Sequence, residues 1–592
     1  MTRPGAWMAR ITAVALIAAG TAFAAPDPAK ILRVATPDIE TLDPQQWSDD
    51  PSFQVQDAIF EPLYEWHYLD SPPHLAPLTA TAAPEITDGG RTWTIRVKPG
   101  IYFTDDPAFK GKPRELVAAD YVYSLTRWID PNLARGGAPA ITDIVVGARA
   151  VIDAASRPGA KLDYDRPIAG LRALDRYTLQ LRLTEPHYPL IEAWLTLGAV
   201  AREVVEAAGG DIRVRAVGTG PYKLREWKRG SRIVLEANPG YRTLRFPESA
   251  DPARAALVAS MRGKALPQIG VVELAVIDED LPRLLEFDRG RLDHIFLRGE
   301  VANRPLVDGR LSPAYIARGV TRISFPEPYV FSFYFNIVDP GVGGMDNERV
   351  ALRRAIGLGI DVAALARVVY AGQAIPANQK IPPGVTGHDP ALPPKSRYDP
   401  AAAASLLDRF GYGRRDVEGY RLRPDGAPLR LTLSLRSGQV SREIATLWKK
   451  NMDALGIRIE FHLTPFQDLI KEIESAKFQI CFAGFGGNPS GYIELFQLYG
   501  KAPRATNIPH FQLAAYDALV EQFLQSARSD EQIALARKMS DIADAYMPIF
   551  PALFRLENDY VQPWLMGFSP PLWNNNWKYL DIDVAKRNAS MR

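Results

Sequence analysis

A strand, a helix and a second strand follow one another within residues 429–463, and this order restricts the fold more than any other stretch. Alternating apolar residues predict strands over 429–435 and 457–463. Between them, apolar residues recur at helical spacing, with Ser441 as the expected N-cap and Gly456 just past the helix end. This is the pattern of a βαβ unit, so the sequence predicts an α/β fold with parallel strands.

The stretch Val217–Arg242 predicts a β-hairpin. Gly218 and Gly220 flank a threonine directly before a proline, so the stretch begins with a turn. Two runs of alternating apolar residues follow, on either side of Arg229-Gly230-Ser231. We expect these runs to pair as antiparallel strands.

Length and composition indicate a large globular chain. With 592 residues, 47% of them hydrophobic and 23% charged, it is long enough for two or three domains. The formal net charge is only +2, which provides no basic field for nucleic acid. We therefore expect no nucleic-acid partner.

The first 24 residues read as a signal peptide. Two arginines precede the apolar run 11–20, and Ala22-Phe23-Ala24 supplies small residues for cleavage near Ala24/Ala25. A membrane anchor is the alternative, but the run is shorter than the roughly 20 residues that a span needs. The sequence thus predicts an exported protein that is free in the periplasm.

Residues for catalysis or metal binding form no recognisable motif. The seven histidines are scattered without an H-E-x-x-H or another close pair, and Cys481 is the single cysteine. We expect no metal site and no cofactor, with a cluster formed in space as the open alternative. No G-x-S-x-G or P-loop motif is present, which argues against a hydrolase and an ATPase.

Several short motifs, in this order, resemble those of extracellular solute-binding proteins of family 5, the peptide, dipeptide and nickel receptors of ABC importers. The G-T-G-P-Y that opens the hairpin and the N-P-x-Y that closes it carry the resemblance most clearly. The others are L-D-P at 42–44, F-E-x-L at 60–63, W-T-I-R-V-K-P-G at 93–100 and Y-D-P at 398–400.

The resemblance implies a periplasmic-binding-protein-like α/β fold of type II, in its large three-domain variant. Two lobes then enclose a ligand cleft, and the first domain is discontinuous. The implied division is signal peptide 1–24, domain I at 25–59, 188–332 and 555–592, domain II at 60–187, and domain III at 333–554.

The implied function is that of the periplasmic substrate-binding component of an ABC importer. Such a protein is not an enzyme and is expected to be a monomer. It captures a peptide or peptide-like solute by closing its cleft, and delivers it to a permease that works with separate ATPase subunits. The alternatives are a haem-binding, nickel-binding or chaperone-like relative with the same fold and, from another class, an exported hydrolase.

The segment Phe482–Ser490 matches the part of oligopeptide-binding relatives that carries an aspartate for the peptide's ammonium group. Phe485 keeps the family's aromatic residue, whereas Asn488 stands at the acid's position and Phe482 at a basic one. An uncharged amide binds an ammonium group less strongly, so we expect weak binding of peptides with free amino termini. Asp49, Asp50 or Glu494 are alternative sources of the acid.

Aromatic residues dominate the expected ligand site. Because side chains alternate between the faces of a strand, Phe331 and Phe333 are expected on one face, and Ser332 and Tyr334 on the other. The complete set of expected ligand-binding residues is Trp47, Tyr329, Phe331, Phe333, Phe482, Phe485 and Asn488.

Overall fold

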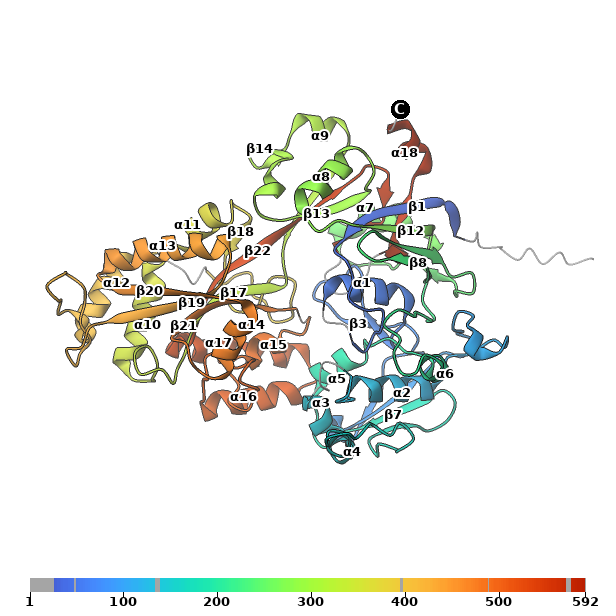
Figure 1. Ribbon diagram of the computed structural model, residues 1–592, viewed down its shortest axis with the longest axis horizontal. Helices are drawn as coiled ribbons and strands as arrows, with labels where there is room; N and C mark the ends of the chain where they lie inside the picture. Colours follow the sequence, from blue (N-terminus) through green and yellow to red (C-terminus); the bar gives the residue numbers. More distant parts are fainter. Residues whose placement is uncertain are drawn as a thin grey trace, which may run out of the picture.

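The computed structural model describes residues 26–46, 49–133, 139–393, 398–487, 489–570 and 577–590. Two lobes lie side by side in it (Figure 1). The expected signal peptide and its cleavage site lie outside the described residues, as do Trp47 and Asn488. Within the described part, no helix has the length and apolar character required to cross a membrane.

One 12-stranded sheet runs through both lobes, in the order β20-β19-β21-β17-β22-β13-β1-β12-β9-β8, with β16 and β18 also paired to β22. We call the half with β1 lobe one and the half with β19 lobe two. The strands of lobe one are β1 (Asp27–Thr36), β8 (Tyr222–Lys228), β9 (Arg232–Ala237), β12 (Ile269–Val276), β13 (His294–Leu297) and β16 (Thr321–Pro326). Those of lobe two are β17 (Tyr329–Phe335), β18 (Ala374–Pro376), β19 (Arg430–Arg436), β20 (Arg458–Thr464) and β21 (Ile480–Gly486).

Two strand crossings join the lobes. The strand β22 (Ile549–Val561) pairs with β17 through its first half and with β16 through its second half. Only Glu327 and Pro328 separate β16 from β17, and the amide of Glu327 donates to the carbonyl of Arg555 at 2.9 Å. The chain therefore passes between the lobes twice, on neighbouring and hydrogen-bonded strands.

The predicted βαβ unit is confirmed in lobe two. β19 and β20 are parallel, with Leu431 opposite Ile459, and α13 (Gln439–Leu455) connects them. Gly456 ends the helix in the left-handed conformation at φ 69°. The expected N-cap was wrong, because the helix begins at Gln439 after Gly438, and Ser441 already lies inside it. Only two residues separate the end of β19 from this helix, so the helix starts at once.

Helices cover both faces of the lobe-two half-sheet (Figure 1). One face packs with α10 (Asn347–Gly359), α12 (Pro400–Leu407) and α13 into a single apolar cluster. The other face packs with α14 (Phe466–Glu474), α15 (Tyr492–Phe496), α16 (Ala514–Gln525) and α17 (Ser529–Tyr546). This two-sided burial is what a sheet with parallel strands requires.

A smaller four-stranded sheet completes lobe one, in the order β4-β5-β7-β6. Its strands are β4 (Glu85–Thr87), β5 (Thr92–Arg96), β6 (Leu171–Ala173) and β7 (Thr178–Arg182). α2 (Ala118–Trp128) and α5 (Tyr188–Trp194) contribute to the same apolar core. At the far end of lobe one from β22, α5 contacts α16 of lobe two (Figure 1).

The predicted hairpin is confirmed as β8 and β9, and its glycine turn fits against the end of α1 (Asp50–Ile59). A Cβ atom on Gly218 or Gly220 would collide with the backbone carbonyl of Ile59, which explains why this turn contains glycines. The buried carboxylate of Glu61 accepts hydrogen bonds from Thr219 at 3.0 Å and Tyr241 at 2.9 Å. The motifs at 60–63 and 218–241 thus form one contact.

Candidate ligand cleft

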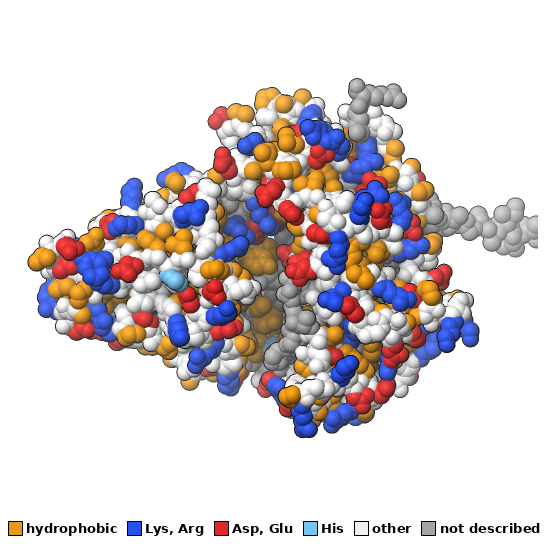
Figure 2. Space-filling view, in the orientation of Figure 1, with side chains coloured by type: hydrophobic (Ala, Val, Ile, Leu, Met, Phe, Trp, Pro, Cys, Tyr) orange, Lys and Arg blue, Asp and Glu red, His pale blue; other side chains and the backbone are white. Residues whose placement is uncertain are grey.

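A deep hollow separates the two lobes, with apolar side chains gathered along it (Figure 2). β17 and β21 lie on the lobe-two side of this hollow. They pair antiparallel, from Tyr329 opposite Gly486 to Phe335 opposite Ile480. β19 pairs with β21 only at Ile480 and Cys481. Among the described residues, the part of β21 after Cys481 therefore has a ladder partner on one side only, which is β17.

Three of the predicted aromatic residues lie on one face of this wall. The ring of Phe331 is 6.0 Å from that of Phe482, and the ring of Phe333 is 4.6 Å from it. Phe333 is fully buried and packs on Trp448 of α13 at 4.7 Å, whereas Phe331 and Phe482 stay half-exposed. The predicted grouping of Phe331 with Phe333 on one face is confirmed.

Phe485 lies on the opposite face of β21, against the cluster formed by α14–α17. Tyr329 begins β17 beside the lobe crossing and is half-buried. Gly484 faces Phe331, whose ring would be 2.5 Å from a Cβ atom at that position, so a glycine here lets the ring lie flat against the strand. The five expected residues that the structure describes are thus spread over two faces, and their contact with a ligand stays a prediction.

Charged residues surround the crossing between the lobes. The buried carboxylate of Glu327 lies 2.8 Å from the guanidinium of Arg298 and 2.6 Å from that of Arg555. Arg298 also pairs with Glu557 at 3.1 Å, and Arg555 stacks on Phe331 with its guanidinium 4.1 Å from the ring centre. Burial raises the pKa of Glu557 to about 7. The crossing therefore holds a polar network beside the aromatic wall.

Two of the alternative acids have different environments. Asp49 caps α1 by accepting from the Ser52 amide at 2.7 Å, while its other oxygen is buried without a hydrogen bond. Burial raises the pKa of its neighbour Asp50, and the positive charge of Arg298 opposes this shift. Asp50 therefore lies within electrostatic reach of Arg298 and Glu327 of the crossing network, from the side of lobe one.

Glu494, the third alternative, is buried inside lobe two on α15. Neither of its oxygens has a hydrogen-bond partner, and burial raises its pKa to about 8. Lys380 is buried nearby, where its ammonium group lies 5.8 Å from the centre of the Tyr516 ring and forms no hydrogen bond, and burial lowers its pKa to about 8. No sequence motif predicts that Lys380 and Glu494 lie near each other, because 114 positions separate them.

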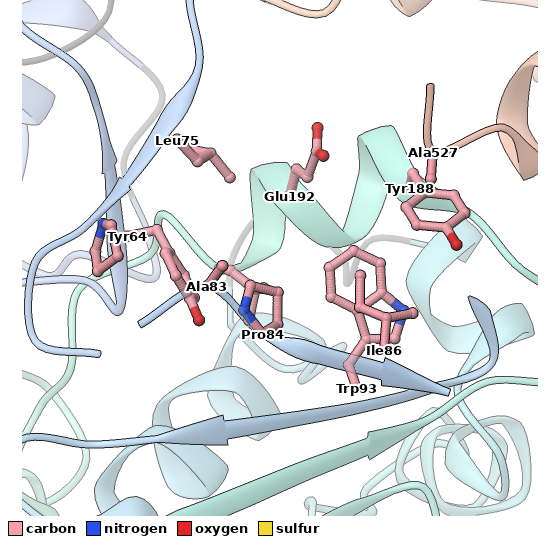
Figure 3. A pocket seen from close by; sticks show the side chains of 11 residues that line it. Tyr64, Leu75, Ala83, Pro84, Ile86, Trp93, Tyr188, Glu192 and Ala527 are labelled. Carbon is pink, nitrogen blue, oxygen red and sulfur yellow. The ribbon is translucent and has the colours of Figure 1, made fainter. Parts of the chain in front are cut away.

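A cavity of about 280 Å³ lies where the small sheet of lobe one meets lobe two (Figure 3). Trp93 and Ile86 line it from the sheet, Tyr188 and Glu192 from α5, and Ala527 from lobe two. Burial raises the pKa of Glu192 to about 7. None of the predicted aromatic residues that the structure describes lines this cavity, and the sequence analysis did not predict a cavity here.

One group of possible metal ligands is present in the described part of the chain. His67, Asp70 and His74 place three ligand atoms within 4.8 Å of one another. The sequence analysis found no close histidine pair, because His67 and His74 come together only through the pairing of a hairpin. The two prolines between them are a sign of a turn from which this hairpin could have been suggested.

The model of bacterial extracellular solute-binding proteins, family 5 Middle, matches residues 74–506. The chain belongs to this family. As a family 5 solute-binding protein, it has the type II periplasmic-binding fold that the resemblance implied, and its solved neighbours share that fold.

Curated relatives match this family 5 protein along nearly its whole length. The periplasmic oligopeptide-binding protein OppA of Salmonella typhimurium is 23% identical, covering 94% of each chain. The probable deoxycholate-binding periplasmic protein YgiS of Escherichia coli is 24% identical, covering 90% of this chain and 89% of the relative. The solved structure of DppA from Helicobacter pylori with the peptide STSA has a TM-score of 0.64 at 18% identity, covering 93% and 98% of the two chains.

Proposed function

We propose that this family 5 protein is the periplasmic substrate-binding component of an ABC importer. The observation that carries the proposal is the pair of strand crossings, which join two lobes around an aromatic-walled cleft. A solute held in that cleft contacts both lobes only when they close, so binding favours the closed state. The closed, monomeric protein then docks on a membrane permease, and no reaction is carried out on the solute.

The solute is a peptide or a peptide-like compound with a large apolar part. The half-exposed rings of Phe331 and Phe482 offer apolar area, and Arg555 places one positive charge directly beside it. A mostly apolar wall with a few placed polar groups is typical of small-molecule sites. Two relatives are named for binding an oligopeptide and deoxycholate, and these ligands support a peptide or another solute with a large apolar part.

Native mass spectrometry of the freshly exported protein tests this function. We expect a retained small molecule that dissociates on mild activation. Small-angle scattering should then give a smaller radius of gyration for the loaded protein than for the stripped one. An unchanged radius at proven saturation would contradict closure around the solute.

We further expect Asn488→Asp to strengthen the binding of peptides with free amino termini by about 1–3 kcal/mol, the scale of a hydrogen bond to a charged group. The reason is the family resemblance, which places an acid at this position. Calorimetry with one panel of di- to pentapeptides and their N-acetylated forms measures the difference. The acetylated peptides are the control, since they lack the ammonium group and should gain nothing.

Tight wild-type binding of unblocked peptides that Asn488→Asp leaves unaltered would show that the acid comes from elsewhere. In that case Asp49, Asp50 and Glu494 become the positions to test.

A further inference from the structure

The hairpin of β2 (Tyr64–Trp66) and β3 (Leu75–Pro77) brings two histidines together. The ladder pairs Trp66 with Leu75, and the next pair along it is His67 and His74, whose backbones share a 2.9 Å hydrogen bond. Paired residues of an antiparallel ladder point to the same face. The two imidazole rings accordingly stack, with centres 5.0 Å apart and planes at 13°.

Asp70 completes the group from the loop between the two strands. Its Oδ2 lies 3.1 Å from His67 Nδ1 and 3.9 Å from His74 Nε2. Its other oxygen, Oδ1, accepts a 2.7 Å hydrogen bond from the hydroxyl of Ser249. His67 Nδ1 is buried, and apart from its 3.1 Å contact with Asp70 Oδ2 it forms no hydrogen bond among the described residues, so two nitrogens and one carboxylate oxygen converge on one place.

The loop that carries these residues is anchored. Tyr68 stacks on Tyr579 at 4.1 Å, and its hydroxyl donates to the carbonyl of Gly567 at 2.8 Å. Leu69 is buried in the same small core, together with Phe246. His67 and Asp70 are therefore held by their neighbours in the chain, and the exposed His74 is the most adjustable member of the group.

We propose that His67, Asp70 and His74 bind a divalent transition-metal ion. Two neutral imidazoles and one carboxylate carry a single negative charge, and this donor set suits Zn²⁺ and its first-row neighbours. Ligands at 2.0–2.1 Å from a tetrahedral ion lie about 3.4 Å apart, so the present spacing of up to 4.8 Å requires His74 to move inward by about 1 Å. Three protein ligands leave a coordination position open for water or another donor.

This metal site is separate from the cavity of Figure 3. Successive pairs of a ladder point to opposite faces, so His67 and His74 lie opposite to Tyr64 and Leu75, which line that cavity. The inference rests on the geometry of these three side chains and does not depend on the proposed transport function.

Calorimetry with Zn²⁺ on the full chain, prepared without a histidine tag, tests the site. We expect one saturable site, with X-ray absorption showing nitrogen and oxygen ligands that include two imidazoles. His74→Ala and Asp70→Asn should each weaken Zn²⁺ binding by at least about tenfold. Their metal-free thermal unfolding should match that of the wild type, because His74 is exposed and Asp70→Asn keeps an acceptor for Ser249.

The matched control is His462→Ala. His462 is as exposed as His74 and also lies beside a carboxylate, with Nε2 2.8 Å from Glu472, but no third ligand joins it among the described residues. This substitution should leave Zn²⁺ affinity unchanged. The absence of saturable wild-type binding, or equal affinity in His74→Ala and Asp70→Asn, would overturn the proposal.

Ser249→Ala tests whether the second oxygen of Asp70 matters. Hydrogen bonds to metal ligands orient them, and their loss typically weakens metal binding about 10–100-fold. We expect a decrease at the low end of that range, because Ser249 is half-exposed and water can replace its hydroxyl. Imidazole ligation in the absorption spectrum should persist, which distinguishes loss of orientation from loss of the site.

Discussion

Arg127→Met should lower the free energy of unfolding of lobe one by about 3–5 kcal/mol, the usual effect of removing one partner of a buried ion pair. Arg127 is 1% exposed and holds both oxygens of the fully buried Asp43 at 2.8 Å. Burial alone would lower the pKa of Arg127, but the bonds to Asp43 raise it overall. Without the guanidinium, the Asp43 carboxylate stays buried beside an apolar side chain.

This pair also connects two parts of lobe one. Arg127 ends α2, which packs on the small sheet, whereas Asp43 belongs to the segment that follows β1. Arg127 binds Gln45 as well, at 2.8 Å. Arg127→Met therefore removes several contacts between α2 and the segment that follows β1.

Urea unfolding followed by tryptophan fluorescence measures the stability change. Arg213→Met is the control, since Arg213 and Asp211 form an exposed pair whose loss should change stability by less than about 1 kcal/mol. In Arg127→Met with Asp43→Asn, the buried charge is gone and the amide can still accept from the Gln45 backbone, so part of the stability should return. A double variant as unstable as Arg127→Met alone would contradict this account.

The fold was largely predictable because its strands carry strong local patterns. The leucines of β19 alternate without interruption, and the parallel pairing with β20 follows from the single helix between them. The two strand crossings between the lobes were harder to predict. β22 is a 13-residue strand whose two halves pair with different partners, and nothing in its sequence marks where one lobe ends.

The candidate site was predictable only in part. Alternation placed Phe331 and Phe333 together, but it could not show that Trp448 buries Phe333 while Phe331 remains half-exposed, because that depends on which helix covers the face. Alternation also separates Phe482 and Phe485, three positions apart, onto opposite faces of β21, but it does not show which helices each of them packs against. The histidines at 67 and 74 required the register of a hairpin with very short strands.

The buried acid of lobe two leads to the second large effect, which depends on pH. Burial raises the pKa of Glu494 from 4.5 to about 8 in the folded protein. Between these values, the folded state holds a proton that the unfolded state has released, so the free energy of unfolding falls as pH rises. Lys380 acts in the opposite sense above pH 8, since burial lowers its pKa from 10.5 to about 8 and stability returns as pH rises further.

Glu494→Gln should therefore become more stable than the wild type as pH rises from 5 to 8, with a relative gain of about 2–4 kcal/mol over that interval. At pH 5 the two proteins should differ little, because glutamine resembles the neutral acid.

Urea unfolding at closely spaced pH values gives the difference in the free energy of unfolding between the two proteins as a function of pH. The control is Glu474→Gln, which removes an exposed acid of α14 and should leave the wild-type curve unchanged. Adding Lys380→Met to Glu494→Gln should also flatten the rise above pH 8, since the buried ammonium group whose pKa is lowered to about 8 is then gone. Parallel curves for wild type and Glu494→Gln would mean that Glu494 is ionised and compensated in the folded state, with Lys380 as its partner.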